Sequence, residues 1–128
     1  MTPHAWPQLP GTQQLFRIHR NESSRNPKTG RPKLKTFFRR ENDAGLSVFL
    51  SIESVLLAGL DVAGICMLTA GHVYDCPYGL TLVQDSEDHA EIMGVPLRAE
   101  DEKRAMDIAD YLVKVAEDVP LPKRQSAI

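Results

Sequence analysis

The chain has 128 residues, which suffices for one domain with a modest hydrophobic core. Hydrophobic residues make up 42% and charged residues 25%, a balance that is ordinary for globular proteins and excludes a wholly disordered chain. No apolar run approaches the roughly 18 residues that a membrane helix needs, and the N-terminus lacks the layout of a signal peptide. We therefore expect a soluble, cytoplasmic protein without a membrane partner, while the sequence sets no oligomeric state.

Charge is distributed unevenly along the chain. The formal net charge is −2, yet the part before Glu41 carries nine basic side chains and one acid, Glu22. From Glu41 onward there are six basic and sixteen acidic residues, so the two parts have charges of about +8 and −10. This division predicts either a basic segment that binds an anionic partner, or two parts that neutralise each other in the fold.

The N-terminal third predicts one strand and one long loop. Residues 1–13 are rich in proline, glutamine, glycine and threonine without periodicity, which is typical of a flexible lead-in. Residues 15–19 have the alternating pattern of a first strand. The polar stretch 20–35 predicts a basic loop, and long loops in small domains often carry function. A short edge strand is expected over 35–40, followed by a turn over 42–45.

The middle of the chain predicts short strands and helices in turn. A strand is expected over 46–50, and Ser51 is placed to cap a short helix after it. The continuously apolar stretch 62–68 favours a buried strand, with a helix as the alternative. Thr69 is placed to cap a single helical turn over 70–75.

The last third predicts a hairpin and a helix. Strands are expected over 80–83 and 89–93, joined by an acidic turn over 85–88. A helix follows, because the acids at 100–102 suit the first turn of a helix and Pro120 is placed to end it. Its predicted apolar face consists of Ala105, Ile108, Ala109, Leu112, Ala116 and Val119.

These elements together predict the fold class and its limits. We expect a small α+β domain over 14–120, with a short mixed or antiparallel sheet and a C-terminal amphipathic helix. Residues 121–128 are expected to form a C-terminal tail. The sequence contains no internal repeat, no phosphate-binding glycine loop and no nucleophile elbow.

The basic side chains before Glu41 are the first candidate binding residues. A guanidinium group can hold a phosphate or carboxylate with two hydrogen bonds, whereas a lysine offers a point charge. Nucleic acid is not the favoured partner, because no aromatic residue is interleaved with the charges between Arg17 and Lys35. The predicted partner is an acidic protein or a phosphate-bearing ligand, and the candidate residues are Arg17, Arg20, Arg25, Lys28, Arg31, Lys33, Lys35, Arg39 and Arg40.

A second set of residues carries the side chains that bind metals. His72 and Cys76 are one helical turn apart, and His89 and Glu91 would point to one side of a strand. No established zinc spacing is matched, so no metal site is predicted. The thiols of Cys66 and Cys76 lie outside any C-x-x-C unit and are expected to be buried and reduced.

The acidic turn over 85–88 also contains chemistry-bearing side chains. Paired carboxylates there, close to His89, could do acid–base work or hold a divalent cation. The glycine of a calcium-binding loop is missing from the turn. We therefore predict a solvated acidic turn, which is also placed to face the basic loop of the same chain.

Several segments together resemble a group of small bacterial proteins of uncharacterised function. The resemblance covers most of the chain and implies no particular activity. It rests on Leu15-Phe16-Arg17-Ile18, Phe38-Arg39-Arg40, Gly45-Leu46-Ser47-Val48-Phe49-Leu50-Ser51 with Glu53, Thr69-Ala70-Gly71, Gly79-Leu80-Thr81-Leu82-Val83 and Asp88-His89-Ala90-Glu91-Ile92-Met93-Gly94.

The first half also resembles the RES-type toxins, which are ADP-ribosyltransferase-like domains that use NAD. This resemblance implies that Arg17 contacts the NAD phosphates and that Glu53 is the catalytic acid. The chain lacks the glycine-arginine-tryptophan stretch of that family, and Phe49 stands where a tyrosine is expected. The leading prediction is a binding module that needs no cofactor, and an NAD-using toxin of a toxin–antitoxin pair is the alternative.

Overall fold

A computed structural model of the chain describes residues 6–19, 33–57 and 64–119. Within these ranges six strands form one sheet in the order β4-β5-β2-β1-β3-β6, and every neighbouring pair is antiparallel. This sheet and its helices confirm the predicted α+β class. The strands are β1 (Gln14–His19), β2 (Leu46–Phe49), β3 (Gly64–Thr69), β4 (Thr81–Ser86), β5 (His89–Met93) and β6 (Glu117–Val119).

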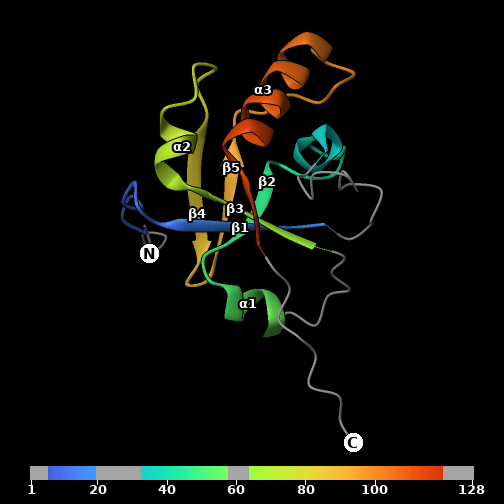
Figure 1. Ribbon diagram of the computed structural model, residues 1–128. Coiled ribbons are helices and arrows are strands. Elements are labelled where there is room, and N and C mark those ends of the chain that lie inside the picture. Colours follow the sequence, from blue (N-terminus) through green and yellow to red (C-terminus); the bar gives the residue numbers. More distant parts are fainter. Residues whose placement is uncertain (1–5, 20–32, 58–63, 120–128) are drawn as a thin grey trace, which may run out of the picture.

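Helices cover both faces of the sheet (Figure 1). They are the 3₁₀ helix η2 (Leu34–Phe37) and the α-helices α1 (Ile52–Leu57), α2 (Ala70–Tyr74) and α3 (Glu102–Val115). Helix α3 lies on one side of the strands and α1 on the other (Figure 1). The predicted C-terminal amphipathic helix is confirmed, with Asp101 as its N-cap: the Asp101 side chain accepts a hydrogen bond from the Arg104 amide.

Alternating strand residues divide the core between the two faces. Leu15 and Cys66 belong to the main cluster, which also contains Ile108 and Leu112 of α3. Phe16 belongs instead to a smaller cluster with buried residues of α1 and β3. Successive side chains of a strand point to opposite faces, so the face of each β1 residue is fixed by these clusters. This assignment decides below which candidate residues can meet.

Two caps that the sequence predicts are present. The Ser54 amide donates to the Ser51 hydroxyl at the start of α1, at 3.1 Å. At the start of α2 the His72 amide donates to the Thr69 hydroxyl at 3.3 Å, and the Thr69 amide donates to His72 Nδ1 at 3.0 Å. This reciprocal arrangement is a capping box in which histidine takes the usual place of glutamate.

The edge strand predicted over 35–40 is wrong. Leu34–Phe37 form a 3₁₀ turn instead, with hydrogen bonds from the Thr36 amide to the Lys33 carbonyl and from the Phe38 amide to the Lys35 carbonyl. The turn buries the successive side chains of Thr36 and Phe37. Packing against α3 therefore determines this segment.

The predicted helix is also too long at its C-terminal end. Helix α3 ends at Val115, Ala116 is extended, and Glu117–Val119 form β6 along the free edge of β3. Val119 precedes a proline, and the ring of Pro120 disfavours helical backbone at the residue before it. Val119 pairs with Ile65 and packs, partly buried, against the smaller core cluster.

The N-terminal segment is held more closely than the predicted lead-in. The Gly71 amide donates to the Gly11 carbonyl and the Ala70 amide to the Gln13 carbonyl, both at 2.9 Å. The backbones approach so closely at this point that a Cβ on Gly71 would lie 3.1 Å from the Gly11 oxygen. These bonds have no periodic pattern in the sequence, which is why the sequence predicted flexibility. Most of the predicted basic loop (20–32) and the tail over 121–128 lie outside the described residues.

Candidate functional site

The candidate basic residues fall into three groups. Arg20, Arg25, Lys28 and Arg31 lie outside the described residues. Two others, Arg17 and Arg39, hold backbone carbonyls within the fold. The remaining three, Lys33, Lys35 and Arg40, have exposed side chains in or beside η2. We call these last three the cationic shelf.

Arg17 joins three elements of the fold. From β1 its Nε donates to the Thr36 carbonyl in η2 at 2.5 Å, and its Nη1 donates to the Ser47 carbonyl in β2 at 2.8 Å. The guanidinium also lies 6.0 Å from the centre of the buried Phe37 ring. Burial, and to a smaller extent the charge of Arg40, lowers the pKa of Arg17 to about 10. Arg17 therefore stays charged at neutral pH and uses that charge on backbone carbonyls.

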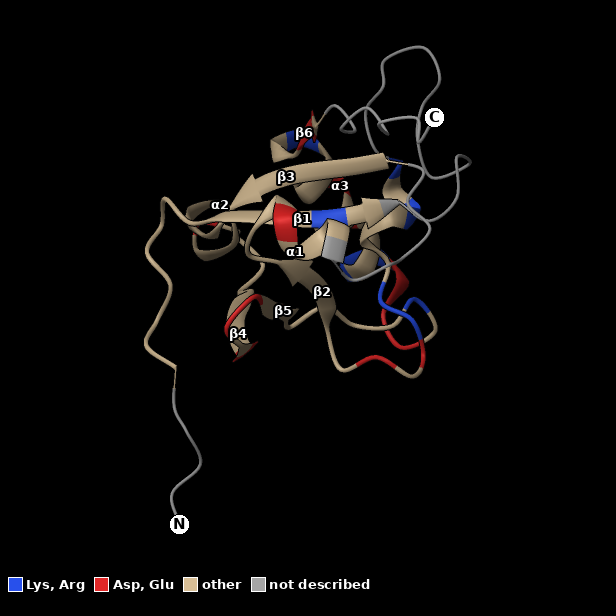
Figure 2. Ribbon diagram, turned by 90° about the horizontal axis from the view of Figure 1, so that it is seen from below, with Lys and Arg blue, Asp and Glu red and all other residues tan. Residues whose placement is uncertain are grey.

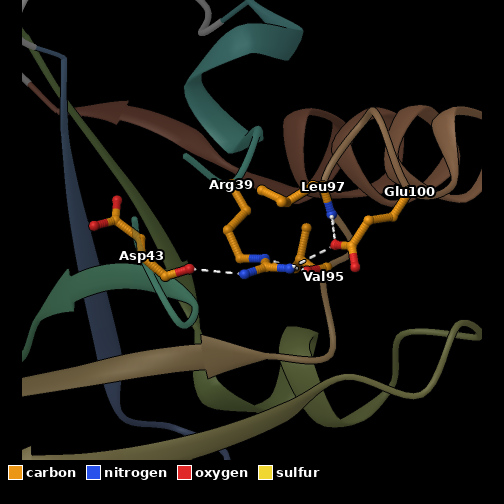
Figure 3. Close-up of polar contacts among 5 residues, drawn as sticks. All are labelled: Arg39, Asp43, Val95, Leu97 and Glu100. Carbon is orange, nitrogen blue, oxygen red and sulfur yellow. Dashed lines mark hydrogen bonds and ion pairs between the residues drawn. The ribbon is translucent and has the colours of Figure 1, made fainter. Parts of the chain in front are cut away.

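Arg39 makes a second set of backbone contacts, drawn in Figure 3. Its Nε donates to the Val95 carbonyl at 2.7 Å and its Nη1 to the Asp43 carbonyl at 2.8 Å. Its Nη2 pairs with Glu100 Oε1 at 3.0 Å, and that oxygen also accepts a hydrogen bond from the Leu97 amide. One side chain thus links the loop after η2, the loop before β2 and the connection from β5 to α3.

The residues of the cationic shelf belong to the segment that Arg17 and Arg39 stabilise. Arg17 binds the carbonyl of Thr36, which follows Lys35, and Arg39 directly precedes Arg40. The segment before β2 also carries the exposed acids Glu41 and Asp43, so both charge signs occur there (Figure 2). The shelf therefore consists of exposed cations with exposed acids close by in the chain.

The turn predicted over 85–88 is shorter in the structure, because β4 continues through Ser86 and only Glu87 and Asp88 form the turn. This acidic end of the hairpin does not face the shelf. Phe49 at the end of β2 pairs with His89, and the Leu50 amide donates to the Asp88 carbonyl at 2.9 Å. The shelf lies beyond the other end of β2, where Leu46 pairs with Ile92. Among the described residues, the ion pair that joins the basic and acidic parts of the sequence is Arg39–Glu100.

Arg17 and Glu53, the two residues of the NAD alternative, are not brought together. Arg17 pairs in register with Cys66, whose side chain is in the main core beneath α3. Glu53 is exposed in the first turn of α1, which covers the opposite face through Phe16 and Val55. The sheet therefore separates the guanidinium from the carboxylate.

The residues with metal-binding side chains are used in separate local contacts. His72 belongs to the capping box of α2, and Cys76 is buried. His89 Nδ1 lies 2.7 Å from Asp85 Oδ1, and its ring meets the Phe49 ring edge-on. Within the described residues, no group of three or more histidine, cysteine, aspartate or glutamate side chains is placed to hold a metal ion.

Cys66 is a buried thiol with a raised pKa. Cys66 lies on β3, which pairs with β1 on one side and β6 on the other. Its side chain is fully buried, and this burial raises the pKa of the thiol to about 12. In the unfolded chain the thiol ionises from about its usual pKa of 9.0, whereas in the folded protein it stays protonated. The folded state thus binds the extra proton above pH 9.0, and stability falls as the pH rises toward the folded pKa.

We therefore expect Cys66→Ala to flatten the pH dependence of stability. Between pH 9 and 10 the parent should lose up to about 1 kcal/mol of unfolding free energy more than the variant. Both proteins contain Arg17, which loses its proton in the folded protein around its pKa of about 10 and changes stability with the opposite sign, so the comparison ends at pH 10. Urea unfolding of both proteins at several pH values measures the two slopes, and equal slopes would contradict the prediction.

A groove at the edge of the sheet is the site that the sequence did not indicate. It measures about 680 Å³ and lies between the N-terminal segment and β4, with Tyr74 of α2 beside it. Its other lining residues are Trp6, Pro7, Gln8, Leu9, Leu80, Thr81, Leu82, Val83 and Gln84. Trp6, the only tryptophan in the chain, lines the groove.

Comparisons with protein-family models, curated proteins and solved structures gave no match for this chain. The comparisons therefore assign no family to this chain, and the two resemblances noted in the sequence stay expectations. Within the described residues, no helix is long and apolar enough to cross a membrane.

Proposed function

We propose that this protein is a binding module without catalysis of its own, and that its cationic shelf engages an acidic protein or a phosphate-bearing ligand. The observation that carries the proposal is the support of the shelf by Arg17 and Arg39. Their four hydrogen bonds to backbone carbonyls fix the segment on which Lys33 and Arg40 are exposed.

A fixed backbone matters because binding by flexible cations is opposed by the entropy lost on ordering them. The backbone at the shelf is already ordered, so an anion meets charges whose attachment points do not move. Exposed ion pairs are also screened by salt, so binding through the shelf should depend on ionic strength.

The alternative, an NAD-using enzyme, receives less support from the geometry. It requires Arg17 to reach a phosphate, yet two of the nitrogens of this guanidinium are hydrogen-bonded to Thr36 and Ser47. It also requires an acid close to Arg17, and Glu53 lies across the sheet. The binding module is therefore the function that we put forward.

The test combines a ligand panel with charge reversal at the shelf. Thermal unfolding would be followed with pyrophosphate, NAD, ADP-ribose, a short DNA and a hexaglutamate peptide, each at low and high salt. We expect stabilisation by at least one of the non-nucleic anions and its loss at high salt. The double variant Lys33→Glu/Arg40→Glu should bind that anion about tenfold more weakly, since two exposed attractions become repulsions.

The matched control is Lys103→Glu/Lys114→Glu. It changes the net charge equally on the exposed surface of α3, where Lys103 pairs with Asp107 and Lys114 with Asp110. Unchanged binding in this control assigns the effect to the shelf. Equal weakening in both double variants, or binding that high salt leaves intact, would contradict the proposal. A response to NAD and ADP-ribose alone that survives the shelf variant would favour the enzyme instead.

A further inference from the structure

The groove beside β4 follows the edge of a strand. Five consecutive residues, 80–84, line it, although their side chains alternate between the two faces of the sheet. A cavity on one face would be lined by every second residue only. Since β4 is the outermost strand of the described sheet, a groove that all five residues line must run along its outer edge.

The opposite wall is an extended segment that α2 holds in place. Residues 6–9 line the groove, and the Leu9 carbonyl accepts a hydrogen bond from the Tyr74 hydroxyl at 2.7 Å. Two residues further on, the Gly11 carbonyl accepts the bond from the Gly71 amide. Figures 1 and 2 both show this N-terminal segment running beside α2 and the β4 edge. The groove therefore has two ordered walls. One is the edge of the sheet, and the other is an extended segment held by α2.

Its surface is uncharged and combines apolar side chains with neutral polar ones such as Gln8, Thr81 and Gln84. Trp6 and Val83 are two of the three large hydrophobic side chains that stay exposed in the described residues, at 37% and 51%, and both line the groove. None of the lining residues carries a formal charge. Charge is instead concentrated past one end of the groove, where Asp85 near the end of β4 and Glu87 and Asp88 in the following turn are exposed.

From these features we propose that the groove binds an extended peptide segment of a protein partner, which adds a strand to the β4 edge. The segment has about five uncharged residues, because five residues of extended chain span the roughly 16 Å of the 80–84 edge. A basic residue flanks it on the side of the acidic turn, where it meets the exposed carboxylates. In the antiparallel orientation that all neighbouring strands here adopt, this residue precedes the uncharged stretch.

This site shares no residue with the cationic shelf, so it does not rest on the proposed function. The two sites also call for partners of opposite charge. A negative result at the groove therefore does not contradict the proposal for the shelf, and a negative result at the shelf does not contradict the proposal for the groove.

Trp6 makes the groove directly observable, because it is the only tryptophan in the chain. The probes are the capped peptide Lys-Lys-Thr-Val-Thr-Val-Thr, the same peptide with two glutamates in place of the lysines, and the lysine peptide with alternate backbone nitrogens methylated. We expect the lysine peptide to shift Trp6 emission with saturation and to slow amide exchange over 81–86. The glutamate peptide should bind at least about fivefold more weakly, and the methylated peptide should not bind, since it lacks the donors that pair with a strand edge.

The variant Val83→Lys tests the location. A charge at the exposed centre of β4 is a natural way to prevent edge pairing, so peptide binding should be lost. Leu56→Lys is the matched control, because Leu56 is similarly exposed, at 55%, but lies on α1 away from the groove. It should bind the peptide like the parent.

Four results would overturn the proposal. The first is no change in Trp6 emission or in amide exchange up to about 1 mM lysine peptide. The second is that the methylated peptide binds as tightly as the lysine peptide, and the third is that Val83→Lys binds the peptide like the parent while its melting temperature is unchanged. The fourth is a Trp6 shift that depends on protein concentration without any peptide. The last result would show that a second copy of the chain occupies the edge.

Discussion

Replacing Arg17 by methionine is expected to lower the free energy of unfolding by about 3 kcal/mol. Methionine keeps the apolar stem but removes both charged donors, at 2.5 Å from the Thr36 carbonyl and 2.8 Å from the Ser47 carbonyl. A hydrogen bond from a charged donor contributes about 1.5–3 kcal/mol, and relief of the buried charge offsets part of the loss. Urea denaturation at neutral pH, followed by circular dichroism, measures the difference.

Arg17→Lys serves as the control for charge. A lysine ammonium keeps the charge but is not a planar fork, so it should recover less than half of the lost stability. A fully stable Arg17→Met protein would show that the two carbonyl contacts contribute little. That result would also revive the NAD alternative, which expects this substitution to remove activity and leave the fold intact.

Replacing Arg39 by methionine is expected to cost a similar amount, about 3 kcal/mol, and to loosen the loops before β2 and after β5. The side chain is 18% exposed and donates to the carbonyls of Val95 and Asp43 as well as to Glu100. Without the Arg39 side chain, the two carbonyls depend on water for a partner. Residues 40–45 and 95–100 then lose the side chain that bonds to both segments. Unfolding in urea and amide exchange over both segments report the two effects.

The neighbouring Arg40→Met is a matched control for Arg39→Met. Arg40 is exposed, so its substitution should change stability by less than about 0.5 kcal/mol. A double-mutant cycle with Glu100→Gln separates the ion pair from the backbone bonds. Glu100 is 60% exposed, and we expect a coupling below about 1 kcal/mol. A coupling as large as the whole Arg39 effect would mean that the ion pair, and not the carbonyls, stabilises the loops.

The basic N-terminal part of the chain thus has a structural role as well as a proposed role in binding. The charge division predicted a surface for a partner, and two of its arginines have become internal supports, Arg17 and Arg39. Arginine suits this use because its donors are fixed in one plane and its charge persists when buried. Mutating all basic residues together would therefore confuse loss of folding with loss of binding, which is why the functional test is limited to Lys33 and Arg40.

Local patterns in the sequence predicted those elements whose signals lie within a few residues. Alternation predicted β1 and β2, side-chain caps predicted the starts of α1 and α2, and apolar residues at helical spacing predicted α3. These signals are reliable here because hydrogen bonding and burial of one face act within a few residues of each other. The α+β class follows from their order.

Features that depend on partners far away in the sequence could not be predicted and follow from the packing of the fold. Leu34–Phe37 became a 3₁₀ turn because α3 covers it, and Glu117–Val119 became a strand because the β3 edge was open to them. The N-terminal wall of the groove beside β4 is held by the hydrogen bond from the Gly71 amide to the Gly11 carbonyl, sixty residues apart in sequence. The role of an arginine was undecided for the same reason: residue type gives the donors, but only the packed fold determines which acceptors they reach.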